Sequence, residues 1–134
     1  MGRFIMRQVS ETALEMQGGD AATPWTVRLD VPEEGGVASG PTPTQLFAFA
    51  LAGCKAIAAL RYAARKHAKL RGVIAEVSYE YADNPRRVST INIRFQGIKE
   101  QMDNETLKRV TAAMEACTIA NTLKHPPVVQ IFVE

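Results

Sequence analysis

The longest apolar stretch of the chain dominates its pattern of hydrophobic and polar positions. From Leu46 to Leu60 the only strongly polar side chain is Lys55. A water-soluble helix with apolar side chains on nearly every face must be covered by other elements on most sides. We therefore predict a long helix at the centre of the fold.

The residues around this stretch set the predicted bounds of the helix. Pro43 precedes the apolar run, and proline suits the first turn of a helix because its missing N–H would have no partner there. Thr42 and Thr44 are both suitable N-cap residues. Gly72 is a typical stop signal just past a helix end, so we expect the helix to run from Pro43 to about Lys69.

Strand-like alternation occurs on both sides of the predicted helix. Residues 3–31 alternate loosely in two or three stretches, of which Trp25–Val31 is the most regular, and Gly18-Gly19-Asp20 is a turn signal between two of them. After the helix, Val73–Tyr81 and Val88–Phe95 alternate on either side of a turn and predict a hairpin with one buried face. Both regions therefore predict antiparallel strands.

The last third of the chain predicts a second helix and a closing strand. Asp103 is a suitable N-cap for a helix over Asp103–Cys117, where apolar residues recur at intervals of three and four. Thr118–Leu123 predicts a further short helical turn, and Val128–Val133 predicts a closing strand. The order of elements has no βαβ alternation and no internal repeat. It predicts an α+β fold, with antiparallel sheets, a long central buried helix and a second helix.

Length and composition agree with a single domain over residues 1–134. A chain of 134 residues can bury a core without disulfide bonds. Its net charge of +2 is too mild to indicate nucleic-acid binding. The N-terminus lacks the apolar segment of a signal peptide, and the run Leu46–Leu60 is shorter than the ~18 apolar residues of a membrane span. These features predict a cytoplasmic protein that binds neither nucleic acid nor a membrane.

Cys54 and Cys117 are the candidate reactive groups. A thiolate that attacks the O–O bond of a peroxide becomes a sulfenic acid, and a second thiol condenses with it to form a disulfide. The alternative is that both cysteines are core residues, because free cysteine is often buried as a small hydrophobe. A static disulfide is disfavoured in the cytoplasm, and neither a CxxC motif nor histidines at metal-ligand spacing occur, so no metal site is predicted.

The sequences around both cysteines resemble the two motifs of the OsmC/Ohr family. Residues 40–54, GPTPTQLFAFALAGC, are similar to the proline-rich lead that enters the central helix of that family and ends at its first cysteine. Residues 117–123, CTIANTL, are similar to its second motif, C-P-[IV]-S-x-x-L, with Thr118 in place of the proline and Ala120 in place of the serine. The hairpin and the terminal strand also fall in the family order, so the resemblance covers nearly the whole chain.

The resemblance implies an intertwined homodimer whose active site forms at the subunit interface around the central helices. It implies a cysteine-based peroxidase of the OsmC-like branch that reduces organic hydroperoxides in the oxidative stress response. By motif position, Cys54 attacks the peroxide and Cys117 resolves the sulfenic acid. Electrons are expected from dithiols such as lipoylated proteins, without a flavin, metal or other cofactor.

One departure from the family pattern concerns activation of the thiolate. In the organic hydroperoxide resistance branch, an acidic residue ten positions before the first cysteine grips a catalytic arginine, and here that position is Thr44. The arginine of that branch comes from the N-terminal strands, where Arg28 is the candidate thiolate-stabilising residue. We expect Thr44, Phe47 and Leu51 to contribute to substrate binding.

The missing carboxylate supports a second interpretation, a non-catalytic OsmC-like dimer that binds a small apolar ligand. An apolar pocket lined by Phe47, Leu51 and Ile57 would suit that role. This interpretation expects the pKa of Cys54 to lie near the ordinary value of ~8.5, whereas a peroxidase requires a lowered pKa. A third interpretation is a structural dimer with two inert core thiols.

Overall fold

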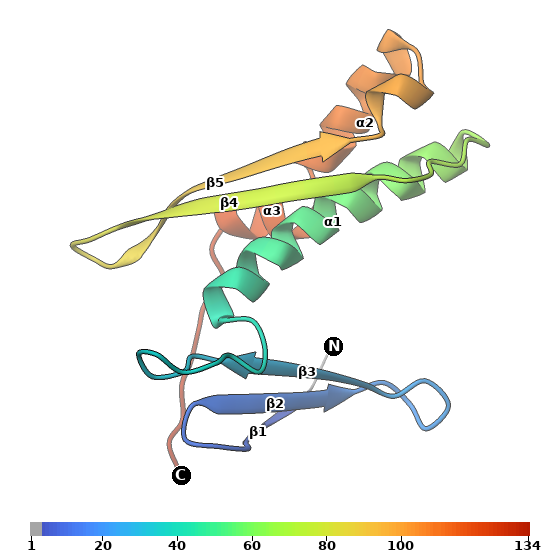
Figure 1. The fold of residues 1–134 in the computed structure, drawn as a ribbon. Helices are drawn as coiled ribbons and strands as arrows, with labels where there is room; N and C mark the ends of the chain where they lie inside the picture. The colour runs from blue at the N-terminus through green and yellow to red at the C-terminus, as the bar shows by residue number, and fades with distance from the viewer. Residues whose placement is uncertain (1–3) are drawn as a thin grey trace. The chain divides into compact units, whose positions relative to one another are not determined.

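The structure is a computed structural model, and it describes residues 4–134. Over these residues it has two antiparallel sheets and three α-helices, which confirms the predicted α+β fold class (Figure 1). The chain forms two compact units, Met1–Phe47 and Ala48–Glu134. The assignment of a single domain to residues 1–134 stays a prediction.

The first unit contains a three-stranded sheet in the order β1-β2-β3. β1 (Ile5–Gln8), β2 (Ala13–Gly18) and β3 (Trp25–Asp30) pair antiparallel in sequence order, as predicted. Successive side chains of a strand point to opposite faces, so alternate residues gather on one side. Together with one residue of the following helix they enclose a small apolar cavity, lined by Met6, Leu14, Met16, Val27, Leu29 and Leu46.

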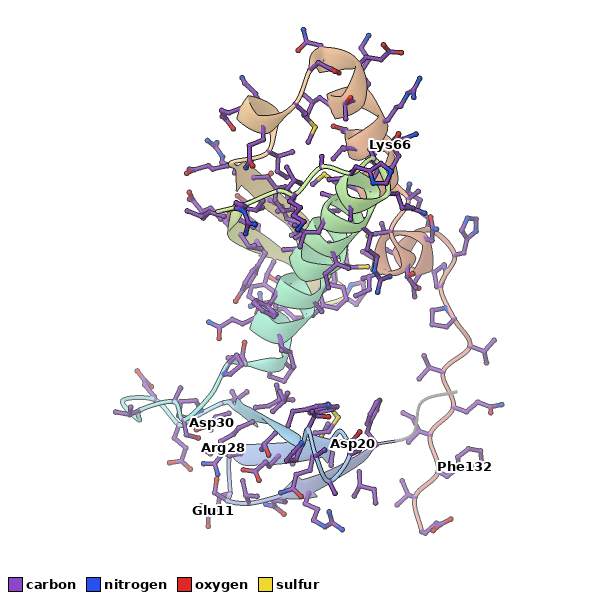
Figure 2. The ribbon with its side chains drawn as sticks, turned by 90° about the vertical axis from the view of Figure 1, so that its right-hand side faces the viewer. Glu11, Asp20, Arg28, Asp30, Lys66 and Phe132 are labelled. Carbon is purple, nitrogen blue, oxygen red and sulfur yellow. The ribbon has the colours of Figure 1, made fainter. Side chains whose placement is uncertain are left out.

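Asp30 anchors the connection that leaves this sheet. Its side chain is buried at the end of β3 (Figure 2). The carboxylate accepts hydrogen bonds from the N–H and the hydroxyl of Ser39, both at 2.8 Å, and from the hydroxyl of Thr12 at 2.7 Å. These donors, the Ser39 N–H above all, lower the pKa of Asp30. The loop between the sheet and the next helix is therefore fixed by a charged side chain.

α1 (Pro43–Arg65) begins at a capping box, which confirms Thr42 as one of the two predicted caps. The Thr42 hydroxyl oxygen accepts a hydrogen bond from the N–H of Gln45 at 3.1 Å. In return, the side-chain oxygen of Gln45 accepts from the N–H of Thr42 at 3.0 Å. The pair satisfies two N–H groups at the helix start, and Pro43 takes the first helical position, where no N–H is needed.

α1 ends at Arg65, about one turn before the predicted end, so that prediction was wrong. The N–H of His67 donates to the Ala64 carbonyl at 3.0 Å, and the N–H of Ala68 donates to the Ala63 carbonyl at 2.9 Å. These are the two hydrogen bonds of a Schellman ending, which requires a residue with positive φ. His67, with φ of 59°, takes that position in place of the glycine that follows later in the chain.

α1 is also long and apolar enough to cross a membrane by length and composition alone, because its best window of 18 residues has a mean hydropathy of 1.5. The prediction that this region falls short of a membrane span does not hold on that criterion. The core helix of a soluble protein passes the same test, however. In this structure α1 buries Leu51, Ala52, Ala59 and Ala63 in the interior of the second unit.

The predicted hairpin forms the sheet of the second unit. β4 (Ile74–Ala82) and β5 (Arg87–Gln96) pair antiparallel, and Figure 1 shows them extending along α1. The register places Val77 opposite Ile93 on the partly buried face, whereas the intervening side chains are exposed. The short 3-10 helix η1 (Lys99–Gln101) follows the hairpin.

Two further helices complete the second unit. α2 (Asn104–Glu115) begins at the predicted N-cap Asp103, whose carboxylate accepts a hydrogen bond from the Thr106 N–H at 2.7 Å. α3 (Thr118–Lys124) confirms the predicted short helical segment. Cys117 lies between the two helices rather than inside α2.

The apolar face of the hairpin and the three helices enclose two core clusters. The buried residues of the first come from α1, α2 and the chain before α2, and they are Ala59, Ile98, Val110 and Met114. The buried residues of the second come from α1 and the start of α3, and they are Leu51, Cys117 and Ala120. Ile91 and Ile93 of β5 pack against the second cluster. Removal of these side chains from water drives the packing that brings α3 to α1.

The predicted closing strand Val128–Val133 was wrong, because this segment has neither helical nor strand structure. A strand exists only where its backbone N–H and C=O groups pair with a neighbouring strand, and within residues 4–134 nothing pairs with this one. Figure 2 labels Phe132 on the irregular chain after α3. The large apolar side chains of the segment are 77–94% exposed, and they are Val128, Val129, Ile131, Phe132 and Val133.

Candidate active site

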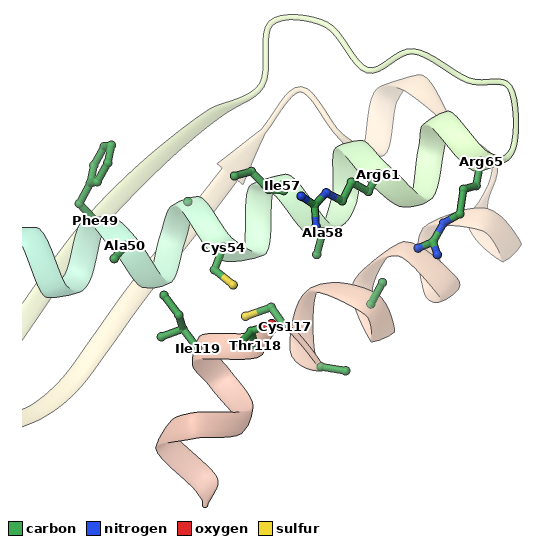
Figure 3. A pocket seen from close by; sticks show the side chains of 13 residues that line it. Phe49, Ala50, Cys54, Ile57, Ala58, Arg61, Arg65, Cys117, Thr118 and Ile119 are labelled. Carbon is green, nitrogen blue, oxygen red and sulfur yellow. The ribbon is translucent and has the colours of Figure 1, made fainter. Parts of the chain in front are cut away.

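Cys54 and Cys117 come together in the second unit. Cys54 lies on α1 and is half-buried, whereas Cys117 is buried between α2 and α3. Cys54 packs against the core cluster to which Cys117 belongs, and Figure 3 shows the two sulfur atoms facing each other. Both side chains are free thiols. The structure therefore places side by side the two residues that the sequence motifs single out.

The break between α2 and α3 positions Cys117. α2 ends at its C-cap Ala116, and Cys117 has the extended angles φ −65° and ψ 156° of an N-cap residue. Asn121 closes the break, because its side-chain amide donates to the Ala116 carbonyl at 3.2 Å and its N–H donates to the Cys117 carbonyl at 3.0 Å. The Cys117 side chain does not cap α3, so the first N–H groups of α3 are available to another acceptor.

The sulfur of Cys54 lies near these groups (Figure 3). The backbone N–H of Ile119 is the largest single cause that lowers the pKa of the Cys54 thiol. Burial opposes the shift, whereas the Cys117 S–H, the Thr118 N–H and the charge of Lys55 lower the pKa further. Donors that bind the thiolate favour it over the thiol. Cys54 therefore has the property that a reactive cysteine needs.

Lys55 ties α1 to the end of α2. Its ammonium group donates a partly buried hydrogen bond to the Met114 carbonyl at 3.1 Å. Met114 lies in the last turn of α2, where carbonyl groups have no partner within the helix. A cation at a helix C-terminus also complements the helix dipole. Lys55 thus holds the end of α2, which leads to Cys117, beside the turn of α1 that carries Cys54.

An open pocket of about 710 Å³ lies over the two cysteines, entirely within the second unit. One face of α1 forms a wall, from Phe49 to Arg65, and the chain from the end of α2 to Ile119 contributes the rest of the lining. Most of the lining is apolar or small. Figure 3 shows the charged side chains, Arg61 and Arg65, toward the C-terminal end of α1.

The residues predicted to bind substrate lie in different places. Ile57 lines the pocket, whereas Leu51 lies in the core cluster of Cys117 and does not line it. Thr44 is in the first turn of α1 and Phe47 is half-exposed, and both belong to the first unit. A role of Thr44, Phe47 and Leu51 in substrate binding stays a prediction.

The lining residues that sequence reasoning missed include Phe49, Arg61, Arg65 and Ile119. The helical period contained the signal for the two arginines. Arg61 and Arg65 follow Cys54 at intervals of two and three helical turns, and residues at such intervals share a face. Ile119 follows Cys117 within the second motif, but only the fold places it in the same pocket as Cys54.

Arg28, the predicted thiolate-stabilising residue, forms an ion pair in the first unit. It lies opposite Glu15 in the register of β2 and β3, and its guanidinium contacts the Glu15 carboxylate at 3.0 Å. A carboxylate from β2 therefore holds this arginine. The role of Arg28 at Cys54 stays a prediction.

The cysteines are not part of a metal-binding cluster in the part of the chain that the structure describes. Across residues 4–134, no three side chains of His, Cys, Asp or Glu gather in a way that could hold a metal ion. His67 follows the end of α1 and His125 is the C-cap of α3, and both are exposed.

Several solved structures have the same fold. An osmotic stress induced and detoxification response protein from Psychrobacter arcticus matches with a TM-score of 0.78 and 23% identity, over 91% of this chain and 88% of that chain. An OsmC like protein from Mycoplasma pneumoniae matches with a TM-score of 0.69 and 18% identity, over 93% and 89% of the two chains. An organic hydroperoxide resistance protein OsmC from Legionella pneumophila, described as a predicted redox protein, matches with a TM-score of 0.52 and 22% identity, over 87% and 92%.

The sequence match defines the family. No curated protein matches the chain. The family model for OsmC-like protein, however, matches residues 35–132, which include both cysteines and all the pocket-lining residues. The match covers far more than half of the 134 residues. The chain therefore belongs to the OsmC-like family.

Proposed function

We propose that the protein is a thiol-dependent peroxidase that reduces organic hydroperoxides through a Cys54–Cys117 redox couple. The observation that carries the proposal is the lowered pKa of Cys54, whose sulfur faces Cys117 beneath an open pocket. The thiolate, rather than the thiol, attacks a peroxide. The family match and the redox description of the Legionella neighbour support the same chemistry.

The first step is the attack of the Cys54 thiolate on the terminal oxygen of the hydroperoxide. An S–O bond forms while the O–O bond breaks, so sulfur is oxidised and the peroxide is reduced. The leaving alkoxide takes up a proton and departs as an alcohol, and Cys54 becomes a sulfenic acid. The N–H groups of Thr118 and Ile119 support this step because they stabilise the thiolate before it reacts.

The second step is the attack of Cys117 on the sulfenic acid. An S–S bond forms, the S–O bond breaks, and the oxygen leaves as water with the proton of the Cys117 thiol. The position of Cys117 against Cys54 supports this step, because a disulfide needs close Cα atoms. An external dithiol, such as that of a lipoylated protein, then supplies two electrons and restores both thiols.

We further propose that the working form is a cytoplasmic homodimer. Each protomer exposes apolar side chains that a second copy would cover, namely Phe49, Ile57 and Leu60 on α1 and the segment Val128–Val133. Exposed apolar patches of this extent mark interaction sites in soluble proteins. The cytoplasm suits the proposal because thiols remain reduced there.

A non-catalytic protein that binds a small apolar ligand is the second candidate. The observation that favours it is the open, largely apolar pocket of about 710 Å³. It expects an ordinary pKa for Cys54, and the lowered pKa favours the peroxidase instead.

Thiol counting after a single addition of peroxide tests the proposed function. The reduced protein receives one equivalent of cumene hydroperoxide, and free thiols and the intact mass are followed. We expect both thiols to disappear, with a mass decrease of two hydrogen atoms. Two thiols that persist for minutes would contradict the peroxidase and favour the ligand-binding candidate.

Two cysteine variants separate the roles within the couple. Cys54→Ser should lower hydroperoxide turnover by roughly a thousandfold or more, because it removes the nucleophile. Cys117→Ser should still consume one equivalent of peroxide but stop at a sulfenic acid, seen as a mass gain of one oxygen atom. Undiminished turnover by Cys54→Ser would rule out the mechanism.

A further inference from the structure

A second groove lies between α1, β5 and α2, entirely within the second unit. Its volume is about 370 Å³, which is within the range of small-molecule binding sites. Its apolar lining consists of Phe95, Ile98, Leu107 and Met114. The groove shares no lining residue with the pocket over the cysteines, so it is a separate site.

Lys55 brings a positive charge to this groove from the buried face of α1. Leu51, Ala52 and Ala59 lie about one helical turn before or after Lys55 on the same face, and all three are buried. The exposed apolar side chains of α1 that a second copy would cover lie about a third of a turn or more around the helix, and none of them lines this groove. The groove is therefore not part of the surface that we assign to the dimer.

The charge of Lys55 has no negative partner among the described residues. Its ammonium group has three N–H donors, and one of them binds the Met114 carbonyl, a neutral acceptor, at 3.1 Å in a partly buried position. The ion pairs of residues 4–134 do not involve Lys55, nor do they involve Lys99 and Glu115, which also line the groove. A buried charge is costly unless an opposite charge neutralises it. A bound anion would supply that charge and accept from the remaining donors.

The charges of the whole groove favour a ligand with a single negative charge. The lining contains the two cations Lys55 and Lys99 and the one anion Glu115, which leaves a single net positive charge. Glu115 repels a dianion such as a phosphate monoester more strongly than it repels a monocarboxylate. The half-buried Phe95 and Leu107 favour an apolar body, because its contact with them removes hydrocarbon surface from water.

We propose that this groove binds small monocarboxylates with an apolar body. The carboxylate accepts hydrogen bonds from the Lys55 ammonium group, and the apolar body packs against Phe95 and Leu107. The site needs no redox chemistry, because neither cysteine lines it. It is therefore independent of the proposed peroxidase function.

A methyl NMR titration of the full, reduced chain with hexanoate tests this site. Ile98 and Met114 report on the groove, whereas Ile57 and Ile119 report on the pocket over the cysteines. We expect hexanoate to shift the methyl signals of Ile98 and Met114, and the neutral hexanamide of the same size to bind about fivefold or more weakly. Unchanged signals of Ile98 and Met114, or equal affinities for hexanoate and hexanamide, would overturn the proposal.

Matched variants locate the carboxylate. Lys55→Met keeps most of the hydrocarbon stem and removes the ammonium group, so it should weaken hexanoate binding about fivefold or more and leave hexanamide within about twofold. Glu115→Gln removes the repelling charge and should tighten hexanoate binding about twofold. Lys108→Met removes a lysine of α2 outside the groove lining and should change neither affinity. Equal losses in the two lysine variants, or weaker hexanoate binding by Glu115→Gln, would contradict the assignment.

Thr111→Phe tests the groove without a change of charge. Thr111 is an exposed residue of α2 in the groove lining, so its replacement leaves the core of the second unit intact. The larger side chain should fill the groove and abolish the hexanoate-dependent shifts of Ile98 and Met114. The spectrum of each variant without hexanoate shows whether that variant is folded. Hexanoate binding of wild-type affinity by folded Thr111→Phe would show that the ligand does not occupy this groove.

Discussion

The Cys54 thiolate is stabilised mainly by main-chain groups. The N–H of Ile119 is the leading donor, and the N–H of Thr118 adds to it at the first position of α3. The second family motif that this chain resembles has proline at the position of Thr118, and proline has no N–H. Because threonine stands at this position, the chain has an additional backbone N–H donor for Cys54. The donor belongs to the main chain, so the chemistry of the threonine side chain does not indicate it.

The substitution Thr118→Pro should raise the pKa of Cys54 toward its ordinary value. Proline suits the first position of a helix, and Cys117 before it already has the extended angles that proline requires, so α3 should persist. The measurement is the alkylation rate of Cys54 against pH, assigned by peptide mass. The inflection should move to higher pH, with a loss of up to about tenfold in rate near neutral pH.

Thr118→Ala is the matched control, because it keeps the N–H and should leave the inflection in place. Equal shifts in the two variants would contradict the assigned donor.

The direction of the Cys54 pKa shift also determines how the stability of the protein depends on pH. Because the pKa of Cys54 is lowered in the folded state, the thiolate stabilises the native protein above the unfolded pKa, and this contribution is lost as pH falls through the folded pKa.

His67 offers a second test at the scale of one residue. Its φ of 59° is unfavourable for a side chain with a Cβ atom, and glycine adopts this conformation without that strain. His67→Gly should therefore raise the free energy of unfolding by about 1 kcal/mol, measured by urea denaturation. His67→Ala keeps the Cβ atom and should give no such gain. Equal urea midpoints for the two variants would show that strain at His67 is absent.

At the scale of elements, the hydrogen bond from Lys55 to the Met114 carbonyl fixes α2 to α1 beside the cysteines. Lys55→Met keeps most of the hydrocarbon stem and removes the donor. It should lower the free energy of unfolding by about 1 kcal/mol and slow disulfide formation after peroxide addition. Denaturation and rapid-quench mass spectrometry measure the two effects.

Lys108→Met is the control for this bond, because Lys108 is an exposed lysine on α2. It should change neither the stability nor the rate of disulfide formation. If Lys55→Met destabilises the protein but leaves disulfide formation at the wild-type rate, the contact supports the fold without positioning Cys117.

Most elements of the fold could be predicted because local chemistry specifies them. The Pro43 entry, the Asp103 cap and the alternation in the hairpin are each encoded within a few residues. The end of α1 could not be predicted in this way. His67 adopts positive φ because of the hydrogen bonds that close the helix, and histidine is not a residue type that marks such an ending.

The residues of the candidate site could be predicted only in part from the sequence. The two cysteines follow from their motifs, and the helical period places Arg61 on the face of Cys54. An apolar run, however, does not indicate which of its faces remains open. Leu51 is therefore in the core while Ile57 lines the pocket, although both are aliphatic residues of the same helix.

At the scale of the whole molecule, the segment Val128–Val133 has the pattern of a strand but no partner among the described residues. Sequence reasoning could not detect this, because apolar alternation indicates a tendency to pair without specifying which chain supplies the neighbour. We expect a second copy to cover these side chains.

Light scattering coupled to size exclusion tests this expectation. The full chain should elute with the mass of a dimer, and deletion of residues 128–134 should shift it toward the monomer because much of the apolar contact is lost. Deletion of Glu134 alone is the control and should leave the dimer intact. A monomeric full chain, or a dimer of unchanged stability after the longer deletion, would contradict the proposed role of the segment.

The separation of Cys54 and Cys117 along the chain has a thermodynamic consequence. The hairpin and α2 lie between them, so a bond between their sulfur atoms would close a loop of roughly 60 residues and, in the chain-entropy treatment, disfavour unfolding by about 4 kcal/mol. The oxidised and reduced forms would then differ markedly in resistance to heat. A melting curve would report which form is present. A cell short of reductant would accumulate the oxidised form, which is the more resistant to unfolding.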